Sequence, residues 1–315
     1  MAGTLDGRVV IVTGAGTGLG REHALAFARH GARVVVNDIG TALDGSALDG
    51  SGNSTGPAAQ VVAEIVAGGG EAVANTDDVA SWGGAAGLIG QAVDAFGGLD
   101  VLVNNAGIVR DRTIVSLSER DWDDVIRVHL KGTFGPTHHA ATYWRGRAKD
   151  GHTNDARIIN TTSASGLFGN VGQANYGAAK AGIAAFTVIA ATELARYGVT
   201  VNAVSPRAIT RMTEGIGRYR EGAVAGESGF VPLAASNVSP LLVWLGSAAA
   251  RDVTGRVFFT SGGRIAVAEG WALGPAVDRE RAWTVEELDA VLPDLVARAA
   301  GNADMDGRRP ADLPA

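Results

Sequence analysis

The chain has 315 residues, enough to bury a core and to form one large or two ordinary domains. Its net charge of -6 argues against a broad nucleic-acid surface. Because no cysteine is present, disulfides, thiolate zinc sites and cysteine nucleophiles are excluded. The 45 glycines and 46% hydrophobic residues suit a tightly turned α/β protein.

The N-terminal residues lack the basic segment and long apolar run of a secretory signal. No uncharged apolar window reaches the length of a membrane span, because the apolar run of the most alanine-rich predicted helix ends near Glu193. We therefore expect a soluble cytoplasmic protein that does not insert in a membrane.

The first elements predict a dinucleotide site. A short apolar strand at Arg8 to Thr13 breaks into a glycine turn, and a helical pattern follows from Arg21 to His30. A second apolar run, Arg33 to Val36, ends in Asn37 and Asp38. In this layout the glycines let the backbone approach a pyrophosphate and the helix N-terminus faces the anion.

Asp38 bears on the choice of cofactor. A carboxylate at the end of the second strand accepts hydrogen bonds from a ribose 2′-hydroxyl and repels a 2′-phosphate, so it favours NAD over NADP. The alternative is a surface acid that only ends a strand. No Arg or Lys follows Asp38 directly, and Arg33 begins the strand instead of ending it.

The stretch Gly40 to Pro57 is rich in Gly, Ser, Asp and Asn and is typical of an exposed loop. Within it, Gly52 to Gly56 matches the G-x-S-x-G pattern of serine hydrolases. That pattern requires a strand before it and a helix directly after it, and here it lies in a polar loop. We therefore reject a hydrolase.

Strands and helices then alternate as far as the strand at 157–159, in the order expected of a parallel sheet covered on both faces. The segment Arg145 to Asp155 reads as a polar loop insertion. Helices are expected at 58–66, 82–96 and 119–134, and strands at 71–79, 100–103 and 157–159.

A chemically specific group follows the last of these strands. Tyr176 and Lys180 are four residues apart on a predicted helix and therefore share a face. A nearby ammonium lowers the pKa of a phenol from about 10, which would suit Tyr176 to proton transfer. The hydroxyl of Ser163 can then hold a substrate oxygen. Considered alone, such a pair is more often a matter of packing and solvation.

These motifs resemble the short-chain dehydrogenase/reductase family. They are TGAGTGLG at 13–20, NNAG at 104–107, Ser163, and YxxxK at 176–180. The resemblance covers about Leu5 to Gly263 and implies a single doubly wound Rossmann domain. Tyr176 would be the acid/base, Lys180 would hold the ribose, and Ser163 would bind the reacting oxygen. It further implies a set of cofactor-binding residues, which are Gly14, Thr17, Gly18, Leu19, Gly20, Asp38, Asp78, Val79, Asn105, Ala106, Gly107, Tyr176, Lys180 and Pro206.

Two positions depart from the family pattern. His129 stands where members usually carry the asparagine of a proton relay, so we include it among the catalytic residues with an open role for its side chain. Pro206-Arg207 stands where Pro-Gly is usual before the substrate loop.

Further stretches resemble the (3R)-hydroxyacyl-CoA dehydrogenase domains of peroxisomal multifunctional enzymes and their bacterial relatives. They are residues 110–134, 163–182, 205–214 and 268–275. The resemblance implies oxidation of a 3-hydroxyacyl-CoA with NAD, in fatty-acid or steroid side-chain breakdown. It also implies a homodimer or homotetramer. A 3-oxoacyl thioester reductase, a hydroxysteroid or other alcohol dehydrogenase, and a non-catalytic NAD-binding regulator remain as alternatives.

Other candidate residues indicate a function less specifically. His138 and His139 are adjacent and cannot share a helical face, and His152 lies in a polar loop, so we expect no metal site. Trp144 and Phe168 either line an apolar substrate mouth or pack in the core. Two arginines of the substrate loop, Arg207 and Arg211, either bind CoA phosphates or are only solvated.

The sequence therefore divides into three parts. Residues 1–265 form the NAD-binding domain with its catalytic site, and residues 266–300 form an extension with an amphipathic helix at Trp283 to Ala300. That helix either packs on its own domain, covers the site, or contacts a second subunit. Residues 301–315 read as a flexible tail.

Overall fold

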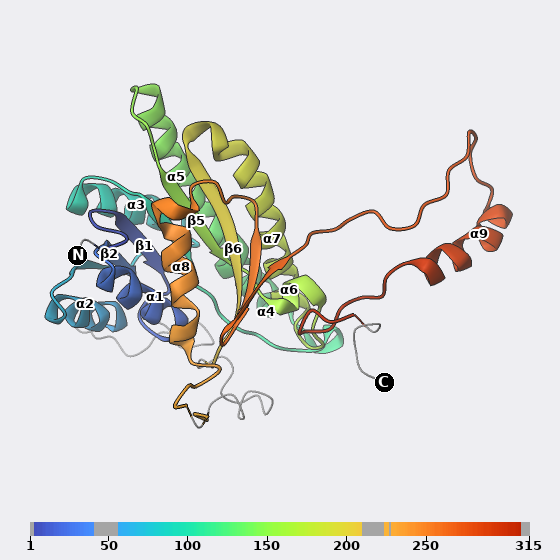
Figure 1. The fold of residues 1–315 in the computed structure, drawn as a ribbon, viewed down its shortest axis with the longest axis horizontal. Helices are drawn as coiled ribbons and strands as arrows, with labels where there is room; N and C mark the ends of the chain where they lie inside the picture. The colour runs from blue at the N-terminus through green and yellow to red at the C-terminus, as the bar shows by residue number, and fades with distance from the viewer. Residues whose placement is uncertain (1–2, 41–55, 210–223, 227, 310–315) are drawn as a thin grey trace.

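Eight strands form one sheet, in the order β3-β2-β1-β4-β5-β6-β7-β8 (Figure 1). The structure is a computed structural model and describes residues 3–40, 56–209, 224–226 and 228–309. Strands β1 to β7 run parallel to their neighbours, and β8 pairs antiparallel with β7. The strands are β1 (Val9–Thr13), β2 (Arg33–Asn37), β3 (Glu71–Asn75), β4 (Val101–Asn104), β5 (Ala156–Thr161), β6 (Val199–Arg207), β7 (Val257–Ser261) and β8 (Arg264–Ala268).

Helices cover both faces of this sheet (Figure 1). One face carries α1 (Gly18–Arg29), α2 (Pro57–Ala67) and α8 (Ser239–Gly246), and the other carries α3 (Trp82–Phe96), α5 (Gly132–Lys149) and α7 (Ala174–Leu194). Because both faces are covered, central strands such as β1 are buried at every residue and do not alternate. The predicted doubly wound α/β fold is confirmed.

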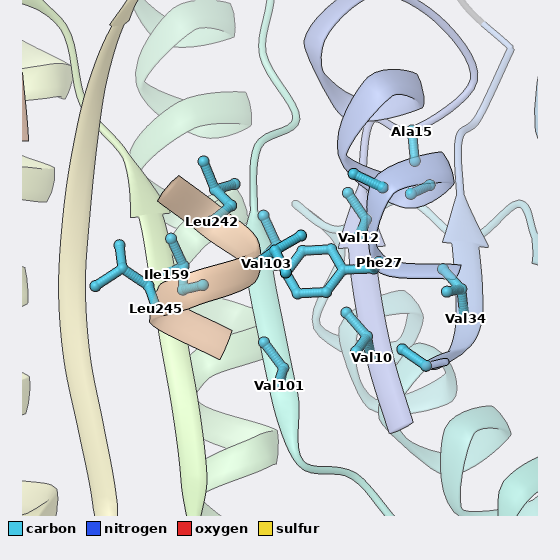
Figure 2. Packing of buried hydrophobic residues seen from close by; sticks show 14 of the residues in the cluster. Val10, Val12, Ala15, Phe27, Val34, Val101, Val103, Ile159, Leu242 and Leu245 are labelled. Atoms are coloured by element: carbon cyan, nitrogen blue, oxygen red, sulfur yellow. The ribbon is translucent and has the colours of Figure 1, made fainter. Parts of the chain in front are cut away.

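Two apolar clusters lie between the sheet and its helices. Figure 2 shows the first, where Phe27 of α1 packs over β1 and β4 beside Val12 and Val103. The second cluster contains Trp144 of α5, which is 1% exposed and donates its indole N–H to the Leu99 carbonyl at 2.8 Å. Trp144 therefore belongs to the core, and a place for it at a substrate mouth is wrong.

The strand order gives the sheet a topological switch point at the carboxyl ends of β1 and β4. β1 pairs with β2 on one side and with β4 on the other, so the connections after β1 and β4 leave in opposite directions. Ligands of open α/β sheets bind at this switch point, outside the carboxyl ends of the strands. Thr13 and Asn104, which end β1 and β4, mark that position here.

The segment between β4 and β5 is more helical than predicted. Helix α4 (Glu119–Ile126) passes into a π-helical turn (Arg127–Lys131), and α5 then continues to Lys149. The expected loop insertion at Arg145 to Asp155 is therefore wrong in its first five residues. The sequence does not predict the full length of α5, because the buried face of this helix combines glycine, threonine and a proline with few large apolar residues.

Several further helical segments are short. These are α6 (Ala164–Phe168) and the 3-10 turns Ile114–Ser116, Ala195–Tyr197, Ala235–Asn237 and Ala248–Ala250. Helix α7 with its following turn, Ala174–Tyr197, has the length and hydropathy of a membrane span, as a buried core helix also can. In this fold it packs against β5 and β6.

Strand β8 crosses residue 265, where the sequence divides domain from extension. The predicted C-terminal helix is α9 (Val285–Arg298); none of its residues is buried, and it lies apart from the sheet (Figure 1). The chain then returns: Asp306 forms an ion pair with Arg207, and Gly307 lies against Phe168. The hydrolase-like loop, the second half of the substrate loop and Arg211 lie outside the described residues.

Candidate active site

The glycine turn after β1 is shaped by close backbone contacts. Gly14 and Gly18 have φ angles of +61° and +57°, which glycine adopts without strain. A Cβ on Gly14 would lie 2.7 Å from the Cα of Ala106, and one on Gly20 would lie 2.2 Å from the Gly14 carbonyl oxygen. These glycines therefore let the turn press against the loop after β4. Thr17, Gly18 and Leu19 stand at the start of α1, and the N-terminus of a helix favours the binding of an anion.

Thr13 and Asn105 clamp the loops after β1 and β4 together. The Thr13 hydroxyl accepts hydrogen bonds from the backbone N–H of Asn105 at 2.9 Å and of Ala106 at 3.1 Å. The Asn105 amide in turn donates to the carbonyls of Thr13 and Gly14, at 2.9 and 3.2 Å. Asn105 thus holds the glycine turn in place. Sequence reasoning missed Thr13, for which a hydroxyl residue ending the first strand was the available signal.

Asp38 is held by two backbone amides at the end of β2. One carboxylate oxygen accepts from Gly16 at 2.8 Å and the other from Gly40 at 2.8 Å. A Cβ on Gly16 would lie 2.7 Å from that carboxylate, so glycine is needed there as well. Gly16 is not among the cofactor-binding residues that the sequence predicts, although it lies within TGAGTGLG at 13–20.

Asp78 and Val79 follow β3. The Asp78 carboxylate accepts from the Ala80 N–H at 2.9 Å and pairs with Arg127 at 2.9 Å. Val79 is buried and packs beside Gly132 at the start of α5. Arg127 begins the π-helical turn, so the pair connects the third strand to the segment that carries His129.

Lys180 is buried beneath the tyrosine of the same helix. Its ammonium donates to the Thr161 carbonyl at 2.6 Å and lies 5.7 Å from the centre of the Tyr176 ring. Burial lowers the pKa of Lys180 to about 7, because a charge without water is costly. The predicted i, i+4 pair is therefore brought together, and its lysine is anchored to the last residue of β5.

Ser163 begins the short helix α6 in extended conformation, and its hydroxyl oxygen accepts from the Ser165 N–H at 3.2 Å. That bond occupies one lone pair of the oxygen and leaves the hydroxyl proton to be donated elsewhere. Ser163 therefore retains a donor suited to a carbonyl oxygen.

His129 lies against the same group. Its ring meets the Tyr176 ring edge-on at 5.1 Å, and Nε2 lies 2.7 Å from the Ile108 carbonyl oxygen. Burial, and to a smaller extent the charge of Lys180, lowers the pKa of His129 to about 3, so the ring is neutral near pH 7. Its Nδ1 is buried without a hydrogen-bond partner among the described residues.

Gly107 makes room for that histidine. A Cβ on Gly107 would lie 2.3 Å from the His129 Cε1 atom. The glycine of the NNAG motif therefore leaves space for the ring of His129.

The predicted residues lie together at the carboxyl ends of the strands. Asp38, Asp78, Asn105 and Ser163 end or follow β2, β3, β4 and β5. Pro206 stands near the end of β6, opposite Thr260 of β7. Among the described residues, no group of three or more His, Asp or Glu side chains has the arrangement of a metal site.

This arrangement fits a dinucleotide cofactor. The turn carries glycine at 14, 16 and 20, where a Cβ would lie less than 3 Å from neighbouring atoms, and it leads directly into the N-terminus of α1. Asp38 and Asp78 follow the strands on one side of the switch point, while Ser163, Tyr176 and Lys180 lie on the other.

Comparison with known proteins assigns the class. The family model described as short chain dehydrogenase matches residues 8–221. The chain therefore belongs to the short-chain dehydrogenase family, whose members are oxidoreductases that use a nicotinamide cofactor.

Individual relatives extend over most of the chain. A crystal structure of a short chain dehydrogenase from Mycobacterium avium is 57% identical, with a TM-score of 0.84 over 96% of this chain and 98% of that one. The hydroxyacyl-CoA dehydrogenase ChsB1 of Mycobacterium tuberculosis is 43% identical over 93% of this chain and 90% of its own length. The peroxisomal multifunctional enzyme type 2 of Mus musculus is 43% identical over 84% of this chain, which spans only 32% of that enzyme.

Proposed function

We propose that the chain is an NAD-dependent dehydrogenase that interconverts a secondary alcohol and a ketone in a 3-hydroxyacyl-CoA type of substrate. The observation that carries the chemistry is the grouping of Ser163, Tyr176 and the buried Lys180 at the carboxyl edge of the sheet. The substrate class is supported by the similarity to a hydroxyacyl-CoA dehydrogenase over nearly the whole chain. Fatty-acid or steroid side-chain breakdown is the proposed setting.

The preference for NAD rests on Asp38. Two backbone amides hold its carboxylate at the end of β2, beside the glycine turn. A fixed negative charge there suits a ribose 2′-hydroxyl and repels a 2′-phosphate. We expect Asp38→Asn, which removes the charge and one of the two hydrogen-bond acceptors, to narrow the preference for NAD over NADP.

The side chains divide the remaining work. A bound nicotinamide cofactor accepts or donates the hydride. In oxidation Tyr176 takes the proton of the substrate hydroxyl at its phenolic oxygen, and in reduction it returns that proton. A lysine cation beneath the ring favours the phenolate, and the Ser163 hydroxyl holds the reacting oxygen in line.

The test is NADH formation with (3R)- and (3S)-hydroxyacyl-CoA, a hydroxysteroid and a simple secondary alcohol, each with NAD and NADP. We expect turnover of the (3R)-thioester with NAD. Tyr176→Phe should lower kcat by about 100-fold or more, since it removes the acid/base group. Tyr143→Phe is the matched control. Tyr143 lies near Gly98, which precedes β4 and is therefore at the amino ends of the strands, away from the proposed site.

The other outcomes separate the remaining functions. Turnover of only the steroid or the simple alcohol would retain the mechanism and contradict the CoA substrate. Reduction of a 3-oxoacyl thioester without measurable oxidation would indicate a reductase. Cofactor binding with no turnover at all would support a non-catalytic regulator.

A homodimer or homotetramer is part of the proposal. Apolar side chains are exposed on the edge strand β8, at Ile265 and Val267, and on α7, at Val188 and Ile189. Such side chains suit burial against a second copy. Light scattering after size-exclusion chromatography gives the assembly mass directly, and a monomer at micromolar concentration would contradict this part.

A further inference from the structure

Gln173, at the start of α7, makes three hydrogen bonds that the proposed chemistry does not use. Its side-chain carbonyl oxygen accepts hydrogen bonds from the Ser165 hydroxyl at 2.6 Å and from the Asn170 side-chain amide at 2.9 Å. Its amide nitrogen donates to the Asp111 carboxylate at 2.8 Å. The backbone of Gln173 also forms a β-bridge with Arg112. Gln173 therefore joins α6 and the start of α7 to the loop after β4, whose Asp111 is 62 residues away in the chain.

One of these bonds leads to Ser163. The buried Ser165 gives its hydroxyl proton to Gln173, and its backbone N–H donates to the Ser163 oxygen at 3.2 Å. Helix α6 has only five residues, and helices of that length are not stable without outside contacts. Gln173 is therefore one of the outside contacts of α6, and it binds the residue whose N–H donates to the Ser163 oxygen.

Tyr176 has a separate anchor. The buried Asn175 accepts from the Tyr176 N–H at 2.8 Å and donates to the carbonyls of Arg110 and Asp121, at 3.1 and 3.0 Å. Removal of the Gln173 side chain leaves these bonds intact. Loss of the Gln173 side chain should therefore displace the Ser163 hydroxyl and leave Tyr176 in position.

We propose that Gln173 is a positioning residue that orients the Ser163 hydroxyl through Ser165. The proposal rests on the proposed function in one respect, that Ser163 holds the reacting oxygen. Gln173 acts on the geometry of that oxygen and has no direct part in proton or hydride transfer.

The kinetic test is a double-mutant cycle. We expect Gln173→Ala to lower kcat about 10-fold, with cofactor affinity unchanged, because the hydroxyl donor is misplaced. On a Ser163→Ala background the same change should cost less than about 2-fold, since the group it positions is gone. An equal loss on both backgrounds would overturn the proposal. Gln60→Ala, on the exposed side of α2, is the matched control.

An exchanged pair separates positioning from loss of stability. Gln173→Glu places a carboxylate against Asp111 and should lower kcat about 10-fold. Adding Asp111→Asn restores a donor and acceptor pair with the direction reversed, and kcat should return to within about 3-fold of the wild type. Failure of the second change to restore kcat would count against the proposed chain of bonds.

A crystal structure of Gln173→Ala tests the proposal without a substrate. We expect the Ser163 hydroxyl to leave hydrogen-bonding distance of the Ser165 N–H while Tyr176 stays in place. A structure in which Ser163 still accepts that bond would overturn the proposal. If the wild type turns over no substrate, the proposed function fails, and this structure still decides the role of Gln173.

Discussion

Burial of Lys180 at the proposed site lowers the stability of the folded chain. Burial lowers the pKa of Lys180 to about 7, whereas an unfolded lysine titrates near 10.4. The folded state therefore binds fewer protons between these values, and stability rises with pH across that window. Below pH 7 the full cost of burying this group is present.

We expect Lys180→Met to abolish turnover and to raise the free energy of unfolding at pH 6 by about 1–3 kcal/mol, after allowance for the unpaired Thr161 carbonyl. The gain should shrink as pH rises from about 7 to about 10. Urea unfolding at several pH values measures it. Lys149→Met, at the exposed end of α5, is the control, and a gain independent of pH would contradict this account.

Gly107 and His129 form a second residue-scale case, in which a missing side chain makes room for a ring. Gly107→Ala places a Cβ 2.3 Å from the His129 ring and should lower the free energy of unfolding by about 1–3 kcal/mol. Adding His129→Asn, with its smaller side chain, should recover part of that loss. Gly90→Ala is the control, because a Cβ there meets nothing within 4 Å. Additive losses in the double variant would contradict the steric explanation.

At the scale of elements, the start of α7 depends on contacts with other segments. The sequence correctly places a helix that carries Tyr176 and Lys180, because their spacing is a local property. It does not reveal that Asn175 ties this helix to the loop after β4 and to α4. Those partners are more than 50 residues away in the chain, so no local pattern records them.

Asn175→Ala should lower the free energy of unfolding by about 2–4 kcal/mol, since it removes three hydrogen bonds made by a fully buried amide. Chemical denaturation measures the change. Asn170→Ala, at a less buried position before the helix, should cost less than about 1 kcal/mol. Equal losses in the two variants would show that the anchoring role of Asn175 is overstated.

At the scale of the whole molecule, two buried histidines bear on acid stability. Burial lowers the pKa of His23, which joins α1 to Ser239 of α8, to about 3, and His129 behaves alike. An unfolded histidine titrates near 6.5. Between these values the unfolded state binds more protons, so stability falls as pH falls, by about 1.4 kcal/mol per pH unit for each group.

We expect His23→Asn, which retains a partner for Ser239, to be less stable than the wild type at pH 7 and to lose less stability from pH 6 to pH 4. The difference in slope should approach about 1.4 kcal/mol per pH unit. Urea unfolding across this range measures it. The control is His152→Asn, whose site is exposed before and after unfolding. A slope that matches the wild type would contradict the role of His23.

Local sequence features were enough to place the glycine turn, Asp38, and the Ser163, Tyr176 and Lys180 group at one edge of a doubly wound sheet. They suffice because turn chemistry, strand ends and helical spacing involve residues close together in the chain. Only the folded chain shows the Thr13 and Asn105 clamp, the burial that lowers the pKa of Lys180, and the antiparallel β8. Each of these depends on which distant segments pack together, and hydrogen bonds, burial and pairing across the sheet leave no periodic trace in the sequence.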